Sequence, residues 1–473
     1  MKNVEIIKPD SFLTENHFYP KAHNSQIHPT VNYFLGLSRS RLVDRYLHLH
    51  PKVDKSWLEN LLNYECKHFF WGGADLFFTA TESGNKRMVV LETNSCPSGQ
   101  KSMPMKDDSD DSRGYGHLIV DSFLPQLKKK RLPKGVLAVV YDKNYMEVSG
   151  YAATLADCTG EDVLLIPCFR KNNKIYFKDG VMYTNLEGEE IAIRAAFRYV
   201  TQSPWSRIPP QTKTFIYNST LCCLAGGRNK LLANKAYELL NAEIPSGGIK
   251  INLPETIKDV SKVEVPLWVK KFGGNAVIKN PYSNAGQGVY TVTSEKELSD
   301  FLDIEHQYDQ FIVQNLIGHY AWSSAGPHGK FFNIGTLPNK KGEIFVTDLR
   351  IMAGNSPKGF FPCAIYARRA KAPMTDVLPA DSWEVLGTNL SKNIGEDQWE
   401  SDTNRLLLMD RKDFNSLGLA LDDLVEGYIQ TILSIVAVDK MAQTLVKKNG
   451  GFKMKLFKSL DRDESLINEI MVD

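Results

Sequence analysis

The chain has 473 residues, 42% of them hydrophobic and 24% charged, and its formal net charge is +2. Such a chain is long enough for two or three packed lobes, and its charge balance excludes a strong general attraction to nucleic acid or to anionic membranes. No apolar stretch approaches the roughly 18 residues that a membrane span needs, and the first residues lack the apolar core of a signal peptide. The seven cysteines, an odd number without regular spacing, favour reduced thiols and a cytoplasmic location.

The N-terminal region, residues 1–132, is predicted to combine helices with one long hairpin. An amphipathic pattern at Asn32–Leu49 predicts a helix that ends before Pro51. Two runs, Ala74–Thr79 and Met88–Thr93, are joined by a polar turn and predict a pair of strands.

Three side chains of this hairpin are candidate metal ligands. Side chains alternate along a strand, so Glu92 and Asn94 point to one face, and Asp75 on the partner strand can be presented to that same face. Two carboxylates and an amide oxygen suit Mg²⁺ that bridges nucleotide phosphates. A surface hairpin with scattered acids is the alternative, but the complete string D…E-x-N-x-x-P-x-G favours a site.

The segment 133–222 changes to alternating strands and helices, which predicts a small Rossmann-like α/β lobe. The apolar run at 136–142 is bounded by turn signals and suits a strand buried on both faces. A helix at 147–156 and a strand at 162–167 complete a βαβ-like unit. Further strands are expected at 191–199 and 214–217.

The segments 223–320 and 321–473 contain the main nucleotide signal. Lys279 ends an apolar strand and is followed at once by a glycine-rich turn at 283–288. Glycines let backbone N–H groups approach phosphate oxygens, and a lysine at the strand end neutralises their charge. The turn alone is a weak signal, and it gains weight from a strand at 311–318. Later strands are expected at 331–335, 344–352 and 361–368, followed by a long helix at 421–446.

Together these motifs resemble ATP-grasp ligases. In most of those ligases the D…E-x-N hairpin comes last, whereas here it comes first, which resembles the circular permutation of eukaryotic glutathione synthetases. LETNSCPSGQKSMP is similar to their metal segment, LAGGRNKLLANKAYEL to the start of a nucleotide-site helix, and VIKNPYSNAGQGV to their glycine-rich loop. The chain also resembles fungal-type proteins described as having a glutathione synthetase ATP-binding domain. The resemblance implies an ATP-grasp fold, with antiparallel sheets and helices enclosing a nucleotide cleft, and implies ATP and Mg²⁺ as cofactors.

The resemblance also implies roles for individual residues. Either Lys230 or Lys235 is the first phosphate lysine, Lys279 is the second, and the strand around 313–316 contacts the adenine edge. The implied nucleotide-binding residues are Lys230, Lys235, Lys279, Ser283, Asn284, Gly286, Gln287, Gly288, Val313, Gln314, Asn315 and Leu316.

One position departs from the eukaryotic glutathione synthetases. Their glycine-rich loop supplies an acidic third metal ligand, and Ser283 stands at that position here. The third role is therefore assigned to Asp75, beside Glu92 and Asn94, as in the unpermuted ligases. Residues that would select γ-glutamylcysteine and glycine are not recognisable, so glutathione itself is not predicted as the product.

The predicted function is an ATP-dependent carboxylate–amine ligase that forms an amide through an acyl phosphate. Arg350, Arg368 and Arg369 are expected on strands that face the cleft, where guanidinium groups suit a carboxylate and an oxyanion. Ser95 and, by resemblance, Arg194 are candidate substrate contacts. For all four arginines the alternative is that they are ordinary surface side chains. The expected partners are a small-molecule carboxylate and an amine, with no nucleic acid and no membrane, and a homodimer is allowed.

Two other function classes stay open, a small-molecule kinase of the inositol phosphate kinase kind and a nucleotide-binding pseudoenzyme. A polyphosphate substrate would demand a dense cluster of lysines and arginines, which the near-neutral net charge does not suggest. The complete set of metal and phosphate ligands argues against the pseudoenzyme. If the hairpin and the glycine-rich turn form one site, we expect them to share one central antiparallel sheet, with the metal at a cleft between lobes.

Overall fold

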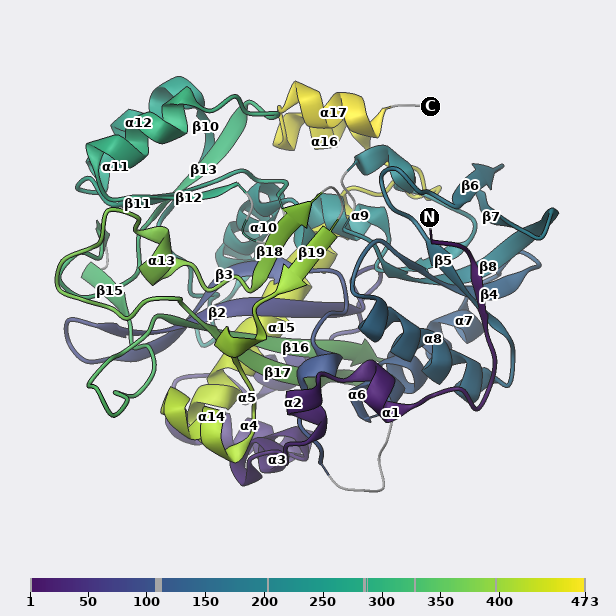
Figure 1. Ribbon diagram of the computed structural model, residues 1–473, viewed down its shortest axis with the longest axis horizontal. Helices are drawn as coiled ribbons and strands as arrows, with labels where there is room; N and C mark the ends of the chain where they lie inside the picture. Colours follow the sequence, from purple (N-terminus) through teal and green to yellow (C-terminus); the bar gives the residue numbers. More distant parts are fainter. Residues whose placement is uncertain are drawn as a thin grey trace.

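The computed structural model describes residues 2–106, 113–201, 204–283, 286, 288–326, 329–395 and 398–471. These residues form three main sheets with helices packed around them, two sheets antiparallel and one mixed (Figure 1). The expected fold class, antiparallel sheets and helices with a smaller α/β lobe, is confirmed. No described helix combines the length and the apolar character that crossing a lipid bilayer requires.

The central sheet joins the predicted hairpin to strands from the second half of the chain. β2 and β3 pair with each other as predicted, and β2 also pairs with β16. The order is β14-β15-β2-β16-β17-β20, with β3 beside β2, and every pairing is antiparallel. The strands are β2 (Trp71–Thr81), β3 (Lys86–Asn94), β14 (Ala325–Gly326), β15 (Gly329–Asn333), β16 (Thr347–Ser356), β17 (Gly359–Arg369) and β20 (Leu406–Leu407).

A long helix, α15 (Leu421–Thr444), supports this sheet and is buried along most of its length (Figure 1). It packs against β2, β3 and β16, and also against α10 (Lys230–Glu243). β2 approaches α15 so closely that a Cβ on Gly72 would lie 2.4 Å from Cγ1 of Ile435, so only glycine fits there. One helix therefore supports both the hairpin and the helix that begins at Lys230.

A β-bulge in β3 sets which side chains point away from α15. Asp75 pairs with Glu92, but the next residue of β2, Leu76, pairs with Val90, so Leu91 is an extra residue in β3. Side chains alternate along a strand, so Glu92, two residues after Val90, would lie with Val90 on the opposite face if β3 were regular. That opposite face packs on α15, where Leu76 is buried.

A separate four-stranded antiparallel sheet, in the order β10-β13-β11-β12, carries the glycine-rich turn. The expectation that this turn and the hairpin share one sheet is wrong. Among the described strands, β11 pairs with β12 and β13 alone, which are close to it in sequence, and β10 pairs with β13, so the four strands form a unit of their own. Its elements are β10 (Thr256–Ser261), β11 (Ala276–Lys279), β12 (Val289–Val292) and β13 (Gln310–Asn315), with α11 (Val265–Lys271) and α12 (Glu295–Asp303).

The third sheet forms the predicted α/β lobe. Its core is parallel, with β4 between β5 and β8, and α8 packs on this core. β1 adds an antiparallel edge to β5, so the first residues of the chain belong to this lobe. A hairpin of β6 and β7, which was not predicted, extends the other side. The elements are β1 (Glu5–Ile7), β4 (Val136–Tyr141), α8 (Tyr145–Thr159), β5 (Val163–Pro167), β6 (Ile175–Lys178), β7 (Val181–Leu186), β8 (Glu189–Tyr199) and β9 (Phe215–Tyr217).

The helix expected over Asn32–Leu49 is two helices, α3 (Pro29–Leu35) and α4 (Arg39–Leu49). Gly36 ends the first, and the Ser38 side chain caps the second by accepting a backbone N–H of its first turn. The remaining elements are α1 (Thr14–His17), α2 (Pro20–His23), α5 (Lys55–Leu62), α6 (Arg113–His117), a π-helical turn (Leu118–Phe123), α7 (Leu124–Lys129), α9 (Thr220–Cys222), α13 (Trp383–Leu386), β18 (Ser391–Gly395), β19 (Gln398–Ser401), α14 (Arg411–Leu417), α16 (Met454–Leu460) and α17 (Glu464–Ile470).

Candidate functional site

A cavity of about 700 Å³ lies where the central sheet, the four-stranded sheet and the α/β lobe meet. Its volume is typical of a site for small molecules. Side chains from all three parts line it, among them Asp75, Glu92, Asn94, Lys143, Arg228, Lys230, Lys279, Asn315, Arg350 and Arg368. The hairpin and the glycine-rich turn therefore meet at one cavity although they belong to different sheets.

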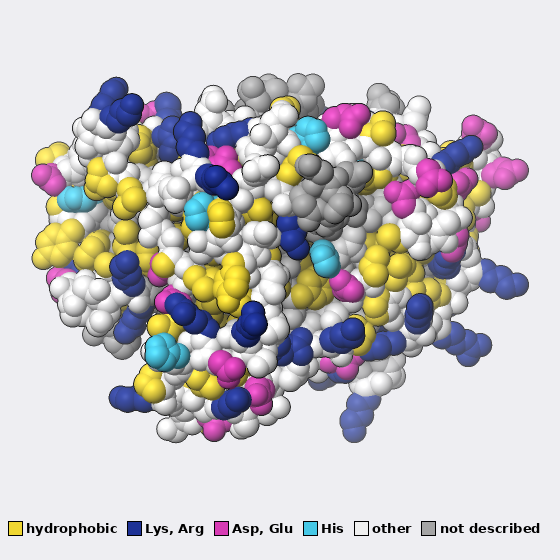
Figure 2. Space-filling model, turned by 90° about the horizontal axis from the view of Figure 1, so that it is seen from below, with side chains coloured by type: hydrophobic (Ala, Val, Ile, Leu, Met, Phe, Trp, Pro, Cys, Tyr) yellow, Lys and Arg dark blue, Asp and Glu magenta, His cyan; other side chains and the backbone are white. Residues whose placement is uncertain are grey.

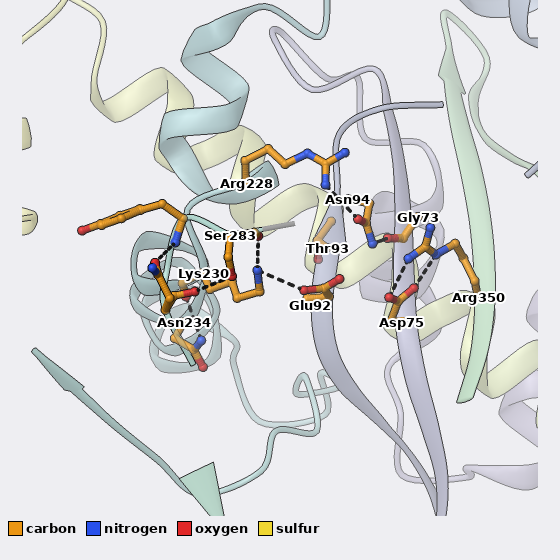
Figure 3. A network of polar contacts seen from close by, with 12 residues as sticks. Gly73, Asp75, Glu92, Thr93, Asn94, Arg228, Lys230, Asn234, Ser283 and Arg350 are labelled. Atoms are coloured by element: carbon orange, nitrogen blue, oxygen red, sulfur yellow. Dashed lines mark hydrogen bonds and ion pairs between the residues drawn. The ribbon is translucent and has the colours of Figure 1, made fainter. Parts of the chain in front are cut away.

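Glu92 and Lys230 face each other in this cavity (Figure 3). Lys230 Nζ lies 3.4 Å from Glu92 Oε2, and it donates a hydrogen bond of 2.7 Å to the carbonyl oxygen of Ser283. Three parts of the chain, the hairpin, the start of α10 and the glycine-rich turn, thus meet at one ammonium group. Lys235, further along α10, instead pairs with Asp259 at 2.7 Å and does not line the cavity. Of the two candidate lysines, the structure brings Lys230 to the site.

Lys279 lies at the end of β11 with 9% of its surface exposed. No described residue forms a hydrogen bond or an ion pair with its ammonium group. Burial lowers the pKa of Lys279 to about 8, against the opposing effects of Glu92 and Asp75, while Lys230 lowers it further. A buried ammonium without a hydrogen-bond partner is costly, so an anion placed beside it would be stabilising.

Asp75 lies at the centre of a buried charge network. Arg350 donates to both of its oxygens, to Oδ2 at 2.6 Å, and Arg368 donates to Oδ2 at 2.9 Å. Arg368 also pairs with Asp348. Burial raises the pKa of Asp75, but the two guanidinium groups outweigh burial and hold this pKa well below its usual range.

The predicted role of Asp75 as a metal ligand does not fit these contacts, because both of its oxygens already accept hydrogen bonds from guanidinium groups. The other two candidates are less tightly engaged: the Glu92 side chain is 30% exposed, and the buried Asn94 accepts at Oδ1 one long hydrogen bond of 3.4 Å, from Arg228. Mg²⁺ commonly takes one or two protein oxygens and completes its shell with phosphates and water, so Glu92 and Asn94 fit an ion carried by a nucleotide. Among the described residues, no group of three or more His, Cys, Asp or Glu side chains is placed to hold a metal ion.

The cavity wall around β13 combines apolar side chains with an unsatisfied amide. Val277, Leu316 and Ile317 line this part. Asn315 Oδ1 is buried, and no described residue donates a hydrogen bond to it. Apolar contact with a flat ring and an acceptor for an amino group are what an adenine base requires, so this wall fits the base of ATP.

Not all predicted nucleotide residues line the cavity. Gln314, Asn315 and Leu316 do, whereas Val313 points into the core of the four-stranded sheet. Ser283 is not among the lining residues, but its carbonyl oxygen accepts the hydrogen bond from Lys230. Gly286 lines the cavity with a φ of 74°, a value that favours glycine, and Gly288 closes the turn with a φ of 66°. Asn284 and Gln287 lie outside the described residues.

The three candidate catalytic arginines divide between two faces of β16 and β17. Arg350 and Arg368 line the cavity. Arg369 follows Arg368 directly, so its side chain lies on the other face of β17, where its guanidinium carbon is 4.5 Å from the centre of the Phe345 ring. The structure therefore brings two of the three to the site.

Neither candidate substrate contact reaches the cavity. Ser95 is fully buried behind the wall, where its oxygens accept hydrogen bonds of 3.3 Å from Arg198. Arg194 lies at the edge of the α/β lobe and pairs with Glu161 at 2.7 Å. Its resemblance to a substrate arginine of the permuted synthetases is therefore not matched by its position.

The sequence reasoning missed the basic residues at and next to the α/β-lobe end of the cavity. Lys143 directly follows β4, and Arg228 stands two residues before Lys230. A usable signal was present for Lys143, because polar residues immediately after a buried parallel strand lie where α/β lobes commonly bind ligands. Cys96, beside these groups, has a lowered pKa: burial raises it, but Arg228 and Arg198 lower it by more.

A scan of protein-family models and a search of curated proteins found no match to this chain. Similar solved structures include an ATP-grasp RimK domain protein from Sphaerobacter thermophilus (13% identity, 48% of this chain and 89% of that chain, TM-score 0.30). They also include a glutathione synthetase-like effector from Globodera pallida (9% identity, 72% of this chain and 81% of that chain, TM-score 0.36). A third is a D-alanyl-alanine synthetase A from Vibrio cholerae (10% identity, 55% of this chain and 95% of that chain, TM-score 0.31).

Proposed function

We propose that this protein is an ATP-dependent ligase that joins a carboxylate to an amine through an acyl phosphate. The observation that supports the proposal best is the meeting of Glu92, Lys230 and Lys279 in one cavity, from segments far apart in the chain. A carboxylate opposite two lysines, next to an apolar wall with an unsatisfied amide, suits the phosphates and the base of ATP. Glu92 and Asn94 would hold Mg²⁺, which would supply Lewis-acid withdrawal of charge from the phosphates.

In the first step, a carboxylate oxygen of the substrate attacks the γ-phosphorus, and the bond from that phosphorus to ADP breaks. Phosphoryl transfer depends mainly on positioning and charge compensation, which Lys230 and Lys279 supply at the phosphate oxygens.

In the second step, the amine attacks the acyl carbon, the bond to phosphate breaks, and the proton that the amine loses as the amide forms passes to the departing phosphate. The tetrahedral oxyanion of this step needs cationic donors. Arg350 and Arg368 line the cavity and are held in place by Asp75 and Asp348, so their guanidinium groups are fixed before substrate arrives.

The second candidate is a small-molecule kinase that phosphorylates a hydroxyl group. One observation favours it: the basic side chains of the cavity form the dense cluster that the net charge of the chain did not suggest. The two candidates differ in how many substrates turnover requires, since the ligase needs a carboxylate and an amine, and the kinase needs a single alcohol.

The test is an ADP-release assay of the full-length protein with Mg·ATP and paired sets of carboxylates and amines, each omitted in turn. We expect release only when both substrates are present, with an amide as product. Lys279→Met should abolish release, and Lys213→Gln, an exposed change outside the cavity, should leave it unchanged. Turnover with one polyol and no amine would establish the kinase, and failure of the wild type to bind Mg·ATP would contradict both candidates.

A further inference from the structure

Positive charge is not spread evenly along the cavity. At the end formed by the central and four-stranded sheets, the described lining residues include four basic side chains (Lys230, Lys279, Arg350, Arg368) and three acidic ones (Asp75, Glu92, Asp348). At the other end, which we call the lobe end, they include five basic side chains (Lys2, Lys101, Lys143, Arg170, Arg207) and one acidic one, Asp142, and Arg228 lies between the two ends, beside Asn94. The excess of positive charge therefore lies at the lobe end, away from the lysines assigned to ATP.

Some of these basic groups already have partners. Arg207 pairs with Asp142 at 3.0 Å, and Lys101 lies 3.8 Å from Glu147, a buried carboxylate just behind the cavity wall. The ammonium group of Lys2 lies over the rings of Tyr141, Tyr145 and Phe169 at 5.3–5.6 Å from their centres.

Lys143 differs from these groups, because no described residue accepts a hydrogen bond from its ammonium group or forms an ion pair with it. Burial lowers the pKa of Lys143 to about 8, and the nearby guanidinium of Arg228 lowers it further. Arg228 itself reaches towards Asn94 Oδ1 at 3.4 Å. Two cations close enough to repel each other, in a partly closed cavity, are stabilised when an anion binds between them.

The position of Lys143 in the fold also favours ligand binding. It lies in the loop between β4 and the 15-residue helix α8, at the carboxyl ends of the parallel strands β4, β5 and β8. This edge of a parallel sheet is where α/β lobes bind ligands, and the positive end of a helix dipole adds to the attraction of anions.

We propose that the lobe end binds the carboxylate substrate as a small molecule with two anionic groups, here called the dianion, one of whose anionic groups is held by Lys143 and Arg228. The proposal rests on the proposed function, in which a carboxylate of the same molecule faces the γ-phosphate of ATP. The group held by Lys143 and Arg228 is a second carboxylate or a phosphate. On the face of the molecule that Figure 2 shows, by contrast, basic and acidic side chains both occur.

The test is calorimetric titration of the full-length protein saturated with Mg²⁺ and the non-hydrolysable ATP analogue AMP-PNP. The probes are succinate, 3-phosphoglycerate, the monoanion acetate, and succinamide as the neutral analogue of succinate. We expect succinate or 3-phosphoglycerate, each with two anionic groups, to bind at least tenfold more tightly than acetate or succinamide. The stronger of succinate and 3-phosphoglycerate identifies the second group as carboxylate or phosphate.

The variants are Lys143→Gln and, as a matched control on the same lobe, Lys213→Gln, which changes an exposed lysine outside the cavity. Lys143→Gln should weaken dianion binding about tenfold, since a hydrogen bond to a charged group is lost, and should leave AMP-PNP affinity unchanged. Lys213→Gln should change neither affinity.

Binding of succinamide as tight as that of succinate, or dianion binding that survives Lys143→Gln, would overturn the inference. The proposed function is tested separately in the same experiment. AMP-PNP binding without dianion binding contradicts only the dianion site, whereas absence of AMP-PNP binding by the wild type contradicts the ligase itself.

Discussion

Arg350 on β16 stands directly opposite Asp75 on β2, and its guanidinium donates to both carboxylate oxygens, to Oδ2 at 2.6 Å. The two residues are 275 positions apart, so this pair fastens the N-terminal hairpin to the second half of the chain. It also fixes the orientation of a cation that lines the cavity. Asp75 thereby acts on the site through Arg350 and Arg368.

Asp75→Asn should therefore destabilise the fold. Removing one partner of a buried ion pair leaves uncompensated charge, and we expect a loss of about 3 kcal/mol in the free energy of unfolding, measured by urea denaturation. Glu92→Gln is the matched control, because its side chain is 30% exposed and the expected change is below about 0.5 kcal/mol. Equal stability of the two variants would show that Asp75 is not a structural anchor.

Glu92→Gln should instead affect the metal dependence of nucleotide binding. We expect wild-type affinity for AMP-PNP to fall when EDTA removes Mg²⁺, and the variant to lose most of that difference, because an amide is a weaker Mg²⁺ ligand than a carboxylate. Calorimetry with and without Mg²⁺ measures both values. A full metal effect in the variant would remove Glu92 from the metal site.

Lys279→Met should weaken nucleotide binding and stabilise the fold at the same time. The lysine is buried without a hydrogen-bond partner among the described residues, so a methionine of similar length removes a desolvation cost of about 1–3 kcal/mol. The same change removes a phosphate contact, which should lower AMP-PNP affinity at least about tenfold. Thermal unfolding without ligand and calorimetry with AMP-PNP test the two effects. A less stable variant would mean that Lys279 has a structural role.

Nucleotide affinity should fall as the pH rises through about 8. The pKa of Lys279 is lowered from 10.5 to about 8, mainly by burial, so the lysine loses the proton that binds phosphate in this range. Between pH 8 and 10.5 the unfolded chain binds more protons at this residue than the folded chain does, so the contribution of Lys279 to stability rises with pH while affinity falls. Calorimetry across this range measures the affinity. Lys279→Arg should keep its charge and remove the decline, whereas Lys143→Gln should keep the decline.

Fragments 1–134 and 135–473 should not bind Mg·AMP-PNP when purified separately. The first contains Glu92 and Asn94, and the second contains Lys230 and Lys279. The cut also separates β2 from β16, its neighbour in the central sheet. Binding by the second fragment alone would show that the hairpin is dispensable for the nucleotide site.

The hairpin and the glycine-rich turn could be predicted because their signals are local. Alternation and a polar turn give β2 and β3, and the run before Lys279 gives β11. The choice between Lys230 and Lys235 could not be made in this way. It depends on Ser283, whose carbonyl oxygen accepts a hydrogen bond from Lys230, and on Asp259, which forms an ion pair with Lys235. Both partners are distant in sequence, so the residues around the two lysines do not indicate these contacts.

The contacts of Asp75 could not be predicted for a related reason. Its partner Arg350 is set by the register between β2 and β16, and a register between distant strands does not follow from the pattern of either strand. The net charge of the whole chain gave no indication of a cluster of basic side chains, because acidic residues elsewhere in the chain balance those at the lobe end of the cavity.

The bulge at Leu91 bears on how this chain is aligned with related sequences. Val90 and Glu92 are two residues apart and would share one face of a regular strand, yet Val90 pairs with Leu76 on the face towards α15 and Glu92 pairs with Asp75 on the cavity face. A relative that lacks the extra residue can keep both pairs in an uninterrupted ladder, with the carboxylate still facing the cavity. In an alignment, a one-residue gap between Val90 and Glu92 is therefore compatible with an intact site, whereas a gap at Thr93 would turn Asn94 to the face opposite Glu92.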